Sequence, residues 1–191
     1  MKLLKERISH SGRVIGNDIL KVDSFLNHQM DIGLFQELGQ EFQRRFSESQ
    51  ITKILTVEAS GIGIACITAQ YFKNVQVVFA KKTSARNLDE NVYESKVFSF
   101  TKDAYYTIRV DKKYISPTDN ILIIDDFLAN GNAVLGLLDI VDQAGAKAAG
   151  VGIVIEKSFQ NGRDLILKRN IRLESLARIK TLAGGKITFV E

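Results

Sequence analysis

The chain has 191 residues, of which 45% are hydrophobic and 25% are charged, and its formal net charge is +4. A single domain accounts for this length, and the composition is that of a globular protein, which excludes a disordered or collagen-like chain. The excess of basic residues suits an anionic ligand. It is too small and too interspersed with acidic residues to indicate a nucleic-acid-binding protein by itself.

The N-terminal part of the chain predicts two helices separated by an irregular segment. The first helix is short and ends near Gly12, and residues 13–29, which show no sustained period, predict a strand and a loop over a site. Apolar residues then recur at spacings of three and four, which predicts a second helix with Asp31 as its N-cap. These apolar residues are Ile32, Phe35, Leu38, Phe42 and Phe46.

The next segments predict strands of a parallel sheet. Residues 51–57 are rich in β-branched side chains, residues 62–72 resume a helical period, and residues 75–80 form a continuous apolar run. A strand, a helix and a strand joined by short connections are typical of a βαβ unit, in which the two strands are parallel. The polar residues from 83 to about 92 predict a loop that closes over a site and excludes water.

Strands and helices continue to alternate in the second half of the chain. Further strands are predicted at residues 97–100, 106–110, 121–124, 148–155, near Leu173 and at 186–190, and further helices at 133–144, closed by Gly145, and at 163–168. We therefore predict an α/β fold in which helices flank a mostly parallel central sheet. The chain 1–191 would form one domain, with a small hood made by about residues 1–30 and 157–191.

The chemistry of such a fold is expected at the carboxyl ends of the parallel strands, where loops lead into helix N-termini. Residues 121–124 lead into two adjacent carboxylates, Asp125 and Asp126, and then into the small residues 129–133 at a predicted helix start. Free backbone N–H groups and the helix dipole favour a phosphate there. The carboxylates can accept hydrogen bonds from sugar hydroxyls or help to hold a divalent cation. The structural alternative is an ordinary turn with two solvated aspartates.

The pattern of residues 121–133 resembles the phosphoribosyl-pyrophosphate motif of the type I phosphoribosyltransferases. That family usually has Thr or Ser in the phosphate loop, where this chain has Asn130 and Ala133. The sequence Ala-Asn-Gly-x-Ala after Asp-Asp-Phe-Leu looks like the branch of the family that acts on xanthine. Residues 20–29, 155–160 and 174–179 are also similar to segments of that branch, so the resemblance extends over nearly the whole chain.

The resemblance implies a purine-salvage enzyme and its ligands. Such an enzyme joins xanthine to 5-phospho-α-D-ribose 1-diphosphate (PRPP) and releases xanthosine 5′-monophosphate and diphosphate. It implies a magnesium ion carried by PRPP, with no separate protein-held metal site, and a homodimer. The alternatives are a phosphoribosyltransferase for hypoxanthine and guanine or for adenine, or a non-catalytic regulator of the same fold that binds nucleic acid. Because no helix-turn-helix with a basic recognition helix precedes the predicted sheet, we expect no nucleic-acid partner.

The resemblance also implies roles for residues along the sugar-phosphate donor. Asp125 and Asp126 would bind the ribose hydroxyls and order the magnesium-bound substrate, and the loop would hold the 5′-phosphate. The loop residues are Ala129, Asn130, Gly131, Asn132 and Ala133. The place of the pyrophosphate loop is taken by Ala59, Ser60 and Gly61, and Lys81, with Lys82 beside it, could neutralise the diphosphate. Ser60 could equally be a local helix cap, and lysines after strands are usually solvated.

Four residues are candidates for binding the base by the same resemblance. Leu20 would cover the apolar face of a purine, and Asn27 offers both a donor and an acceptor to the ring edges. Lys157 could meet an oxo group, and a cation beside xanthine favours the anion that this base readily forms. Phe159 could stack on the ring, although an aromatic residue just after a strand is more often part of the core.

Cysteine content and hydropathy indicate the cellular compartment. Cys66 is the only cysteine and cannot form a disulfide within the chain, which favours a reducing environment. The N-terminal residues are charged too early for a secretory signal, and no apolar run approaches the about 20 residues that span a bilayer. We therefore expect a cytoplasmic protein with no membrane partner.

Overall fold

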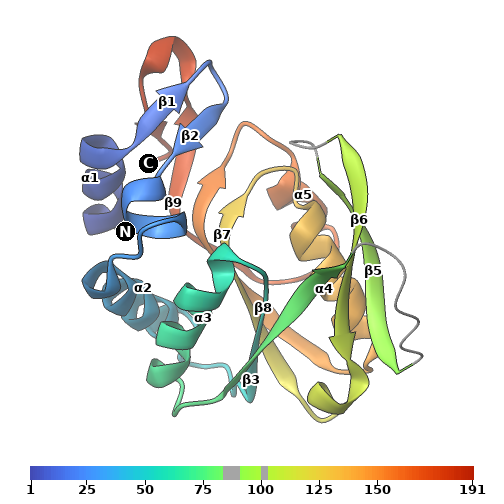
Figure 1. Cartoon of the computed structure of the whole chain (residues 1–191). Helices are drawn as coiled ribbons and strands as arrows, with labels where there is room; N and C mark the ends of the chain where they lie inside the picture. Colours follow the sequence, from blue (N-terminus) through green and yellow to red (C-terminus); the bar gives the residue numbers. More distant parts are fainter. Residues whose placement is uncertain (84–90, 100–102) are drawn as a thin grey trace.

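The computed structural model describes residues 1–83, 91–99 and 103–191, and Figure 1 shows its elements in chain order. The helices are α1 (Lys2–Ser11), α2 (Ile32–Arg45), α3 (Ser60–Tyr71), α4 (Asn132–Gln143) and α5 (Gly162–Leu167), with a π-helix η1 (Asp23–Asn27) and short 3-10 turns η2 (Lys112–Tyr114) and η3 (Ala183–Gly185). The strands are β1 (Arg13–Ile15), β2 (Ile19–Lys21), β3 (Lys53–Val57), β4 (Gln76–Thr83), β5 (Val92–Ser99), β6 (Ala104–Asp111), β7 (Asn120–Leu128), β8 (Lys147–Lys157), β9 (Leu173–Thr181) and β10 (Thr188–Phe189).

The central sheet is parallel in its middle and antiparallel at both edges. Within the described residues it has eight strands in the order β10-β9-β8-β7-β3-β4-β6-β5. The five strands from β9 to β4 pair in parallel, whereas β10 and the β5–β6 hairpin pair antiparallel. All five residues of β3 are buried, as expected for a parallel strand covered on both faces. This confirms the predicted fold class of an α/β protein with a mostly parallel sheet.

Two hydrophobic cores lie on opposite faces of the sheet. One contains apolar side chains of α1, α2 and α3, and the other contains those of α4 and α5 together with the β5–β6 hairpin. Figure 1 shows the corresponding helices on the two sides of β7 and β8. As predicted, Asp31 caps α2, because its carboxylate accepts a hydrogen bond from the backbone N–H of Leu34 at 3.0 Å.

The two ends of the chain lie side by side at one edge of the molecule (Figure 1). Phe25 of η1 and Ile8 of α1 are buried in the same core as Leu182, which follows β9. Residues 13–29 differ in detail from the expected strand and loop: they form a two-stranded antiparallel hairpin followed by η1. The structure does not test the proposed domain boundaries of the hood, which stay a prediction.

Apart from residues 13–29, the predicted helices and strands are found along the described chain, but some boundaries differ. Strand β7 continues four residues beyond the predicted end at residue 124, so the acid pair lies within it. Most of the expected closing loop, residues 84–90, lies outside the described residues. Among the helices that the structure describes, none combines the length and the apolar character needed to cross a bilayer.

Candidate active site

The acid pair lies on β7 with its carboxylates held by the local backbone. Asp125 is buried and lies opposite Ile153 of β8, and Asp126 is half-buried. The Oδ1 atom of Asp125 accepts a hydrogen bond from the N–H of Asp126 at 3.0 Å. In the same way, Oδ1 of Asp126 accepts one from the N–H of Phe127 at 2.9 Å. These bonds orient both carboxylates before any ligand arrives.

Burial makes it unfavourable for both carboxylates to be ionised at once. Desolvation raises the pKa of Asp125 well above its usual value, and the neighbouring charge of Asp126 raises it further. Desolvation also raises the pKa of Asp126, while hydrogen bonding by the Phe127 backbone and by polar groups of Asn27 and Ser60 opposes the rise. Among the described residues no salt bridge joins either carboxylate to a cation. The pair therefore suits a ligand that brings hydroxyl donors or a cation.

Residues predicted for three different parts of the site meet at the acid pair. Asn27 at the end of η1 and Ser60 at the start of α3 both approach Asp126 closely enough to stabilise its charge. A Cβ atom on Gly61 would lie 3.3 Å from Oδ1 of Asp125 and only 2.0 Å from Oγ1 of Thr56, so no larger residue fits there. The fold thus brings together a base candidate, the predicted diphosphate segment and both aspartates.

The two lysines lie within β4 rather than after it, and they differ in position. Successive side chains of a strand point to opposite faces, so Lys81 and Lys82 cannot both face the acid pair. The positive charge of Lys82 acts on Asp125 and lowers the pKa of this carboxyl group. The Nζ atom of Lys82 lies 5.5 Å from the ring centroid of Tyr106. The backbone N–H of Lys82 also donates to a carboxylate oxygen of Glu58, the residue before Ala59. Lys82 is therefore a lysine whose charge reaches the acid pair, and the role of Lys81 at the diphosphate stays a prediction.

The predicted phosphate loop lines a cavity of about 480 Å³ at the start of α4. All five residues 129–133 line it, together with Phe98 and Tyr106 from the β5–β6 hairpin. Gly131 is the N-cap of α4 and has a φ of 85°, in the left-handed region that favours glycine. The first N–H groups of a helix have no partner within it, so this end of the cavity offers donors to an anion. The amide of Asn132 donates to the carbonyl of Phe98 at 2.9 Å and so joins the loop to the hairpin.

The other end of the same cavity is formed by the N-terminal hairpin, the end of β8 and the turn that follows β8. Its lining residues are Asp18, Ile19, Lys157 and Gln160. The Nζ atom of Lys157 donates to the backbone carbonyl of Asp18 at 2.7 Å, and desolvation lowers the pKa of this amine. A volume of this size accommodates a nucleotide-sized ligand between the lysine and the phosphate loop.

The family model of the phosphoribosyl transferase domain matches residues 30–176 of the chain. The chain belongs to the phosphoribosyltransferase family. Curated proteins named xanthine phosphoribosyltransferase are similar to it over its full length. The protein of Ruminiclostridium cellulolyticum is 62% identical over 191 residues, covering 100% of both chains. The protein of Clostridioides difficile is 56% identical over 189 residues, covering 99% of this chain and 100% of that one.

Solved structures of adenine phosphoribosyltransferases share the fold of this phosphoribosyltransferase. The Trypanosoma brucei enzyme, in complex with AMP, pyrophosphate and ribose-5-phosphate, has a TM-score of 0.76 at 18% identity and covers 92% of this chain and 79% of its own. The Rhodothermus marinus enzyme has a TM-score of 0.72 at 20% identity and covers 94% and 100%. At these identities the similarity shows the fold alone.

Two of the predicted base residues differ in their burial in this phosphoribosyltransferase, and their roles stay predictions. Leu20 is 6% exposed and packs in the hydrophobic core, whereas its neighbour Ile19 lines the cavity. Phe159 is 42% exposed, and Gln160 after it lines the cavity. Sequence reasoning missed Ile19, Gln160 and Tyr106. Side chains alternate along β2, so Ile19 points to the face opposite that of Leu20. This alternation could have indicated Ile19 as a cavity residue.

Proposed function

We propose that this phosphoribosyltransferase makes xanthosine 5′-monophosphate and diphosphate from xanthine and PRPP in purine salvage. The observation that carries the proposal is full-length identity of 56–62% to curated xanthine phosphoribosyltransferases. The acid pair on β7 supports it, as do the glycine-containing loop and Lys157, which line one cavity. The residue roles that follow belong to the proposal.

The sugar-phosphate end of the donor fits β7 and the start of α4. The 5′-phosphate binds the backbone N–H groups of residues 129–133, where the positive end of the α4 dipole meets its negative charge. The ribose hydroxyls donate to Asp125 and Asp126, and so supply hydrogen bonds that a buried carboxylate pair needs. Holding both ends of the ribose fixes C1′ for attack by the N9 atom of the base.

The diphosphate binds at the segment Ala59–Gly61 and Lys82, on the side of the acid pair opposite the 5′-phosphate loop. Lys81 is the lysine that the sequence predicts there. Negative charge accumulates on the departing diphosphate while C1′ becomes cationic, so preorganised donors at this end stabilise the transition state. A magnesium ion bound to PRPP would neutralise part of that charge. Carboxylate oxygens are ligands that Mg²⁺ accepts, so Asp125 and Asp126 could complete the coordination of an ion that is held mainly by phosphates.

The base binds between η1 and the end of β8. Asn27 approaches Asp126 and can donate to and accept from a purine edge, and the ammonium of Lys157 faces an oxo group or the xanthine anion. Leu20 and Phe159 remain base candidates; the burial of Leu20 restricts it to shaping the pocket through packing. The hydrogen bond from Nζ of Lys157 to the backbone carbonyl of Asp18 holds the amine beside the cavity.

The proposal extends to the setting in which the enzyme works. We expect a cytoplasmic homodimer with small-molecule substrates and without nucleic-acid or membrane partners. Measuring the molar mass by light scattering tests the dimer. A mass of 21.3 kDa, that of one chain, would contradict it.

A panel of bases tests the proposed activity. PRPP and Mg²⁺ are supplied with xanthine, guanine, hypoxanthine, adenine or uracil, and the nucleotide formed is measured by chromatography. Xanthine should give the highest kcat/KM. Faster turnover of guanine or adenine would mean that the base is wrong while the use of PRPP stands. Sequence-selective binding to duplex DNA without turnover of any base would favour a regulator of the same fold.

A further inference from the structure

A buried carboxylate next to the proposed base-binding lysine joins three elements of the fold. Glu156 is 1% exposed and lies in β8 immediately before Lys157. Five polar side chains, including Glu156 itself, form what we call the Glu156 cluster. Its members are Glu156, Ser158, Arg163, Ser175 and Arg178.

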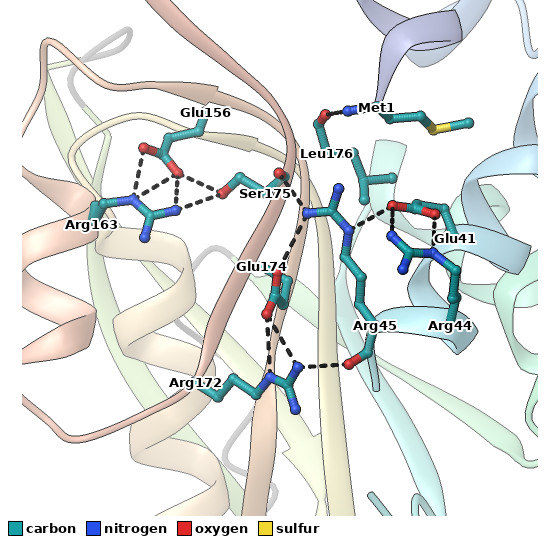
Figure 2. A network of polar contacts seen from close by, with 10 residues as sticks. All are labelled: Met1, Glu41, Arg44, Arg45, Glu156, Arg163, Arg172, Glu174, Ser175 and Leu176. Carbon is teal, nitrogen blue, oxygen red and sulfur yellow. Dashed lines mark hydrogen bonds and ion pairs between the residues drawn. The ribbon is translucent and has the colours of Figure 1, made fainter. Parts of the chain in front are cut away.

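The cluster satisfies both oxygens of Glu156. Arg163 of α5 contacts the carboxylate through Nε at 2.9 Å and Nη2 at 2.7 Å, and Arg178 of β9 donates through Nε at 2.9 Å. The hydroxyls of Ser175 and Ser158 donate at 2.5 Å and 2.7 Å. Burial alone would raise the pKa of Glu156, but the hydrogen bonds from these arginines and serines lower it to about 2. Figure 2 shows the contacts to Arg163 and Ser175.

Arg163 connects this carboxylate to the phosphate loop. It follows Gly162, the first residue of α5, whose N–H donates to the carbonyl of Ala129 at 3.1 Å. The contact has no spare room, because a Cβ atom on Gly131 would lie 3.0 Å from the Cα atom of Gly162. A shift of the first turn of α5 therefore moves the loop. In the sheet, Glu156 is also the register partner of Leu128, the residue before the loop.

The cluster thus lies between the two proposed ends of the substrate site. Lys157 follows Glu156 directly in β8, and the phosphate loop rests against the helix that Arg163 anchors. A buried ion pair adds little to stability compared with apolar residues of the same volume, but it fixes the geometry of the groups that it joins. We propose that Glu156 is a positioning residue that sets the placement of Lys157 relative to the 5′-phosphate loop. This placement aligns N9 of the bound base with C1′ of PRPP. This inference rests on the proposed function for the identity of the base.

Glu156→Gln tests the proposal, because it keeps the shape of the side chain and removes its charge. The dissociation constant for PRPP with Mg²⁺, measured without a base, and the KM for xanthine should both rise about tenfold or more, since displacement of binding groups by a fraction of an ångström is costly. The matched control is Glu174→Gln. Glu174 lies in the same polar region and pairs with Arg45 and Arg172 (Figure 2), and none of these three residues lines the cavity. Glu174→Gln should lower the melting temperature without changing the dissociation constant for PRPP or the KM for xanthine.

The outcomes separate this inference from the proposed function. If Glu156→Gln leaves either constant within twofold of the wild-type value, Glu156 does not position both ends and the inference is overturned. If Glu156→Gln does not fold, Arg163→Lys serves instead, because it keeps the positive charge but loses the two-nitrogen contact with Glu156. Arg163→Lys should weaken PRPP binding severalfold, and unchanged binding would overturn the inference. Turnover of xanthine by the wild-type enzyme tests the proposed function separately. If the wild-type enzyme does not turn over xanthine, the effect of Glu156→Gln is measured on the KM for the base that the enzyme does use.

Discussion

Replacing Gly131 by alanine should damage PRPP binding more than it damages the fold. Gly131 has a φ of 85°, and a residue with a Cβ atom in the left-handed region costs about 1–2 kcal/mol. For a chain of this length the cost corresponds to a fall in melting temperature of about 2–8 °C. The new Cβ atom would also lie 3.0 Å from the Cα atom of Gly162, whose backbone cannot rotate away as a side chain would. The loop must therefore shift, and the KM for PRPP should rise about tenfold or more.

Gly145→Ala is the matched control because it shares the strain without the contact. Gly145 closes the other end of α4 with a φ of 65°, and its nearest neighbour would be Cβ of Pro117 at 3.8 Å, an ordinary contact. Urea denaturation should show a loss of stability for both variants, at least as large for Gly131→Ala as for Gly145→Ala. Steady-state kinetics should show a raised KM for PRPP only for Gly131→Ala. An unchanged KM in Gly131→Ala at the same loss of stability would refute the role of this loop in binding phosphate.

Three further predictions test the remaining parts of the site. Lys157→Ala should raise the KM for xanthine by about tenfold or more, since a lost charged hydrogen bond costs about 1.5–3 kcal/mol, while the affinity for PRPP stays nearly unchanged. Equal losses of xanthine and PRPP binding would show that Lys157 is not part of the base site. Lys82→Gln should raise the KM for PRPP more than Lys81→Gln does, because the charge of Lys82 acts on Asp125 and adjacent side chains of a strand point to opposite faces. The reverse order would contradict this assignment. Asp125→Asn should lower kcat/KM about a hundredfold or more yet raise the melting temperature at pH 8, because burial raises the pKa of Asp125 and the ionised acid destabilises the folded state above that pKa. The gain should vanish as the pH falls toward about 4, the pKa of an unfolded aspartate, and a lower melting temperature at pH 8 would contradict the argument.

Hydrophobic periodicity predicted the types of the elements well because the fold depends on burying apolar faces. The three-and-four spacing after Asp31 indicates a helix packed on the sheet. The run 121–124 shows no period of its own, but its short length and its isoleucines favour a buried strand. The end of β7 was harder to predict. Asp125 and Asp126 look like the polar end of a strand, yet pairing with β8 extends the strand to Leu128 because backbone hydrogen bonds do not depend on side-chain polarity.

Contacts between distant segments could not be predicted from the sequence. Alternation along β4 separates Lys81 from Lys82, but only the place of β4 beside β3 in the sheet shows which of them acts on Asp125. The same holds for Leu20 and Ile19, since the core that buries Leu20 includes residues of α1 and of the segment after β9. The Glu156 cluster joins β8, α5 and β9, and no local pattern in the sequence indicates that these residues meet.

A crystal structure of the enzyme with PRPP and Mg²⁺ tests the central claim most directly. The account predicts the 5′-phosphate against the backbone N–H groups of residues 129–133, with the ribose hydroxyls within hydrogen-bond distance of Asp125 and Asp126. Density for PRPP at any other surface, or carboxylates that make no contact with the ribose, would contradict it.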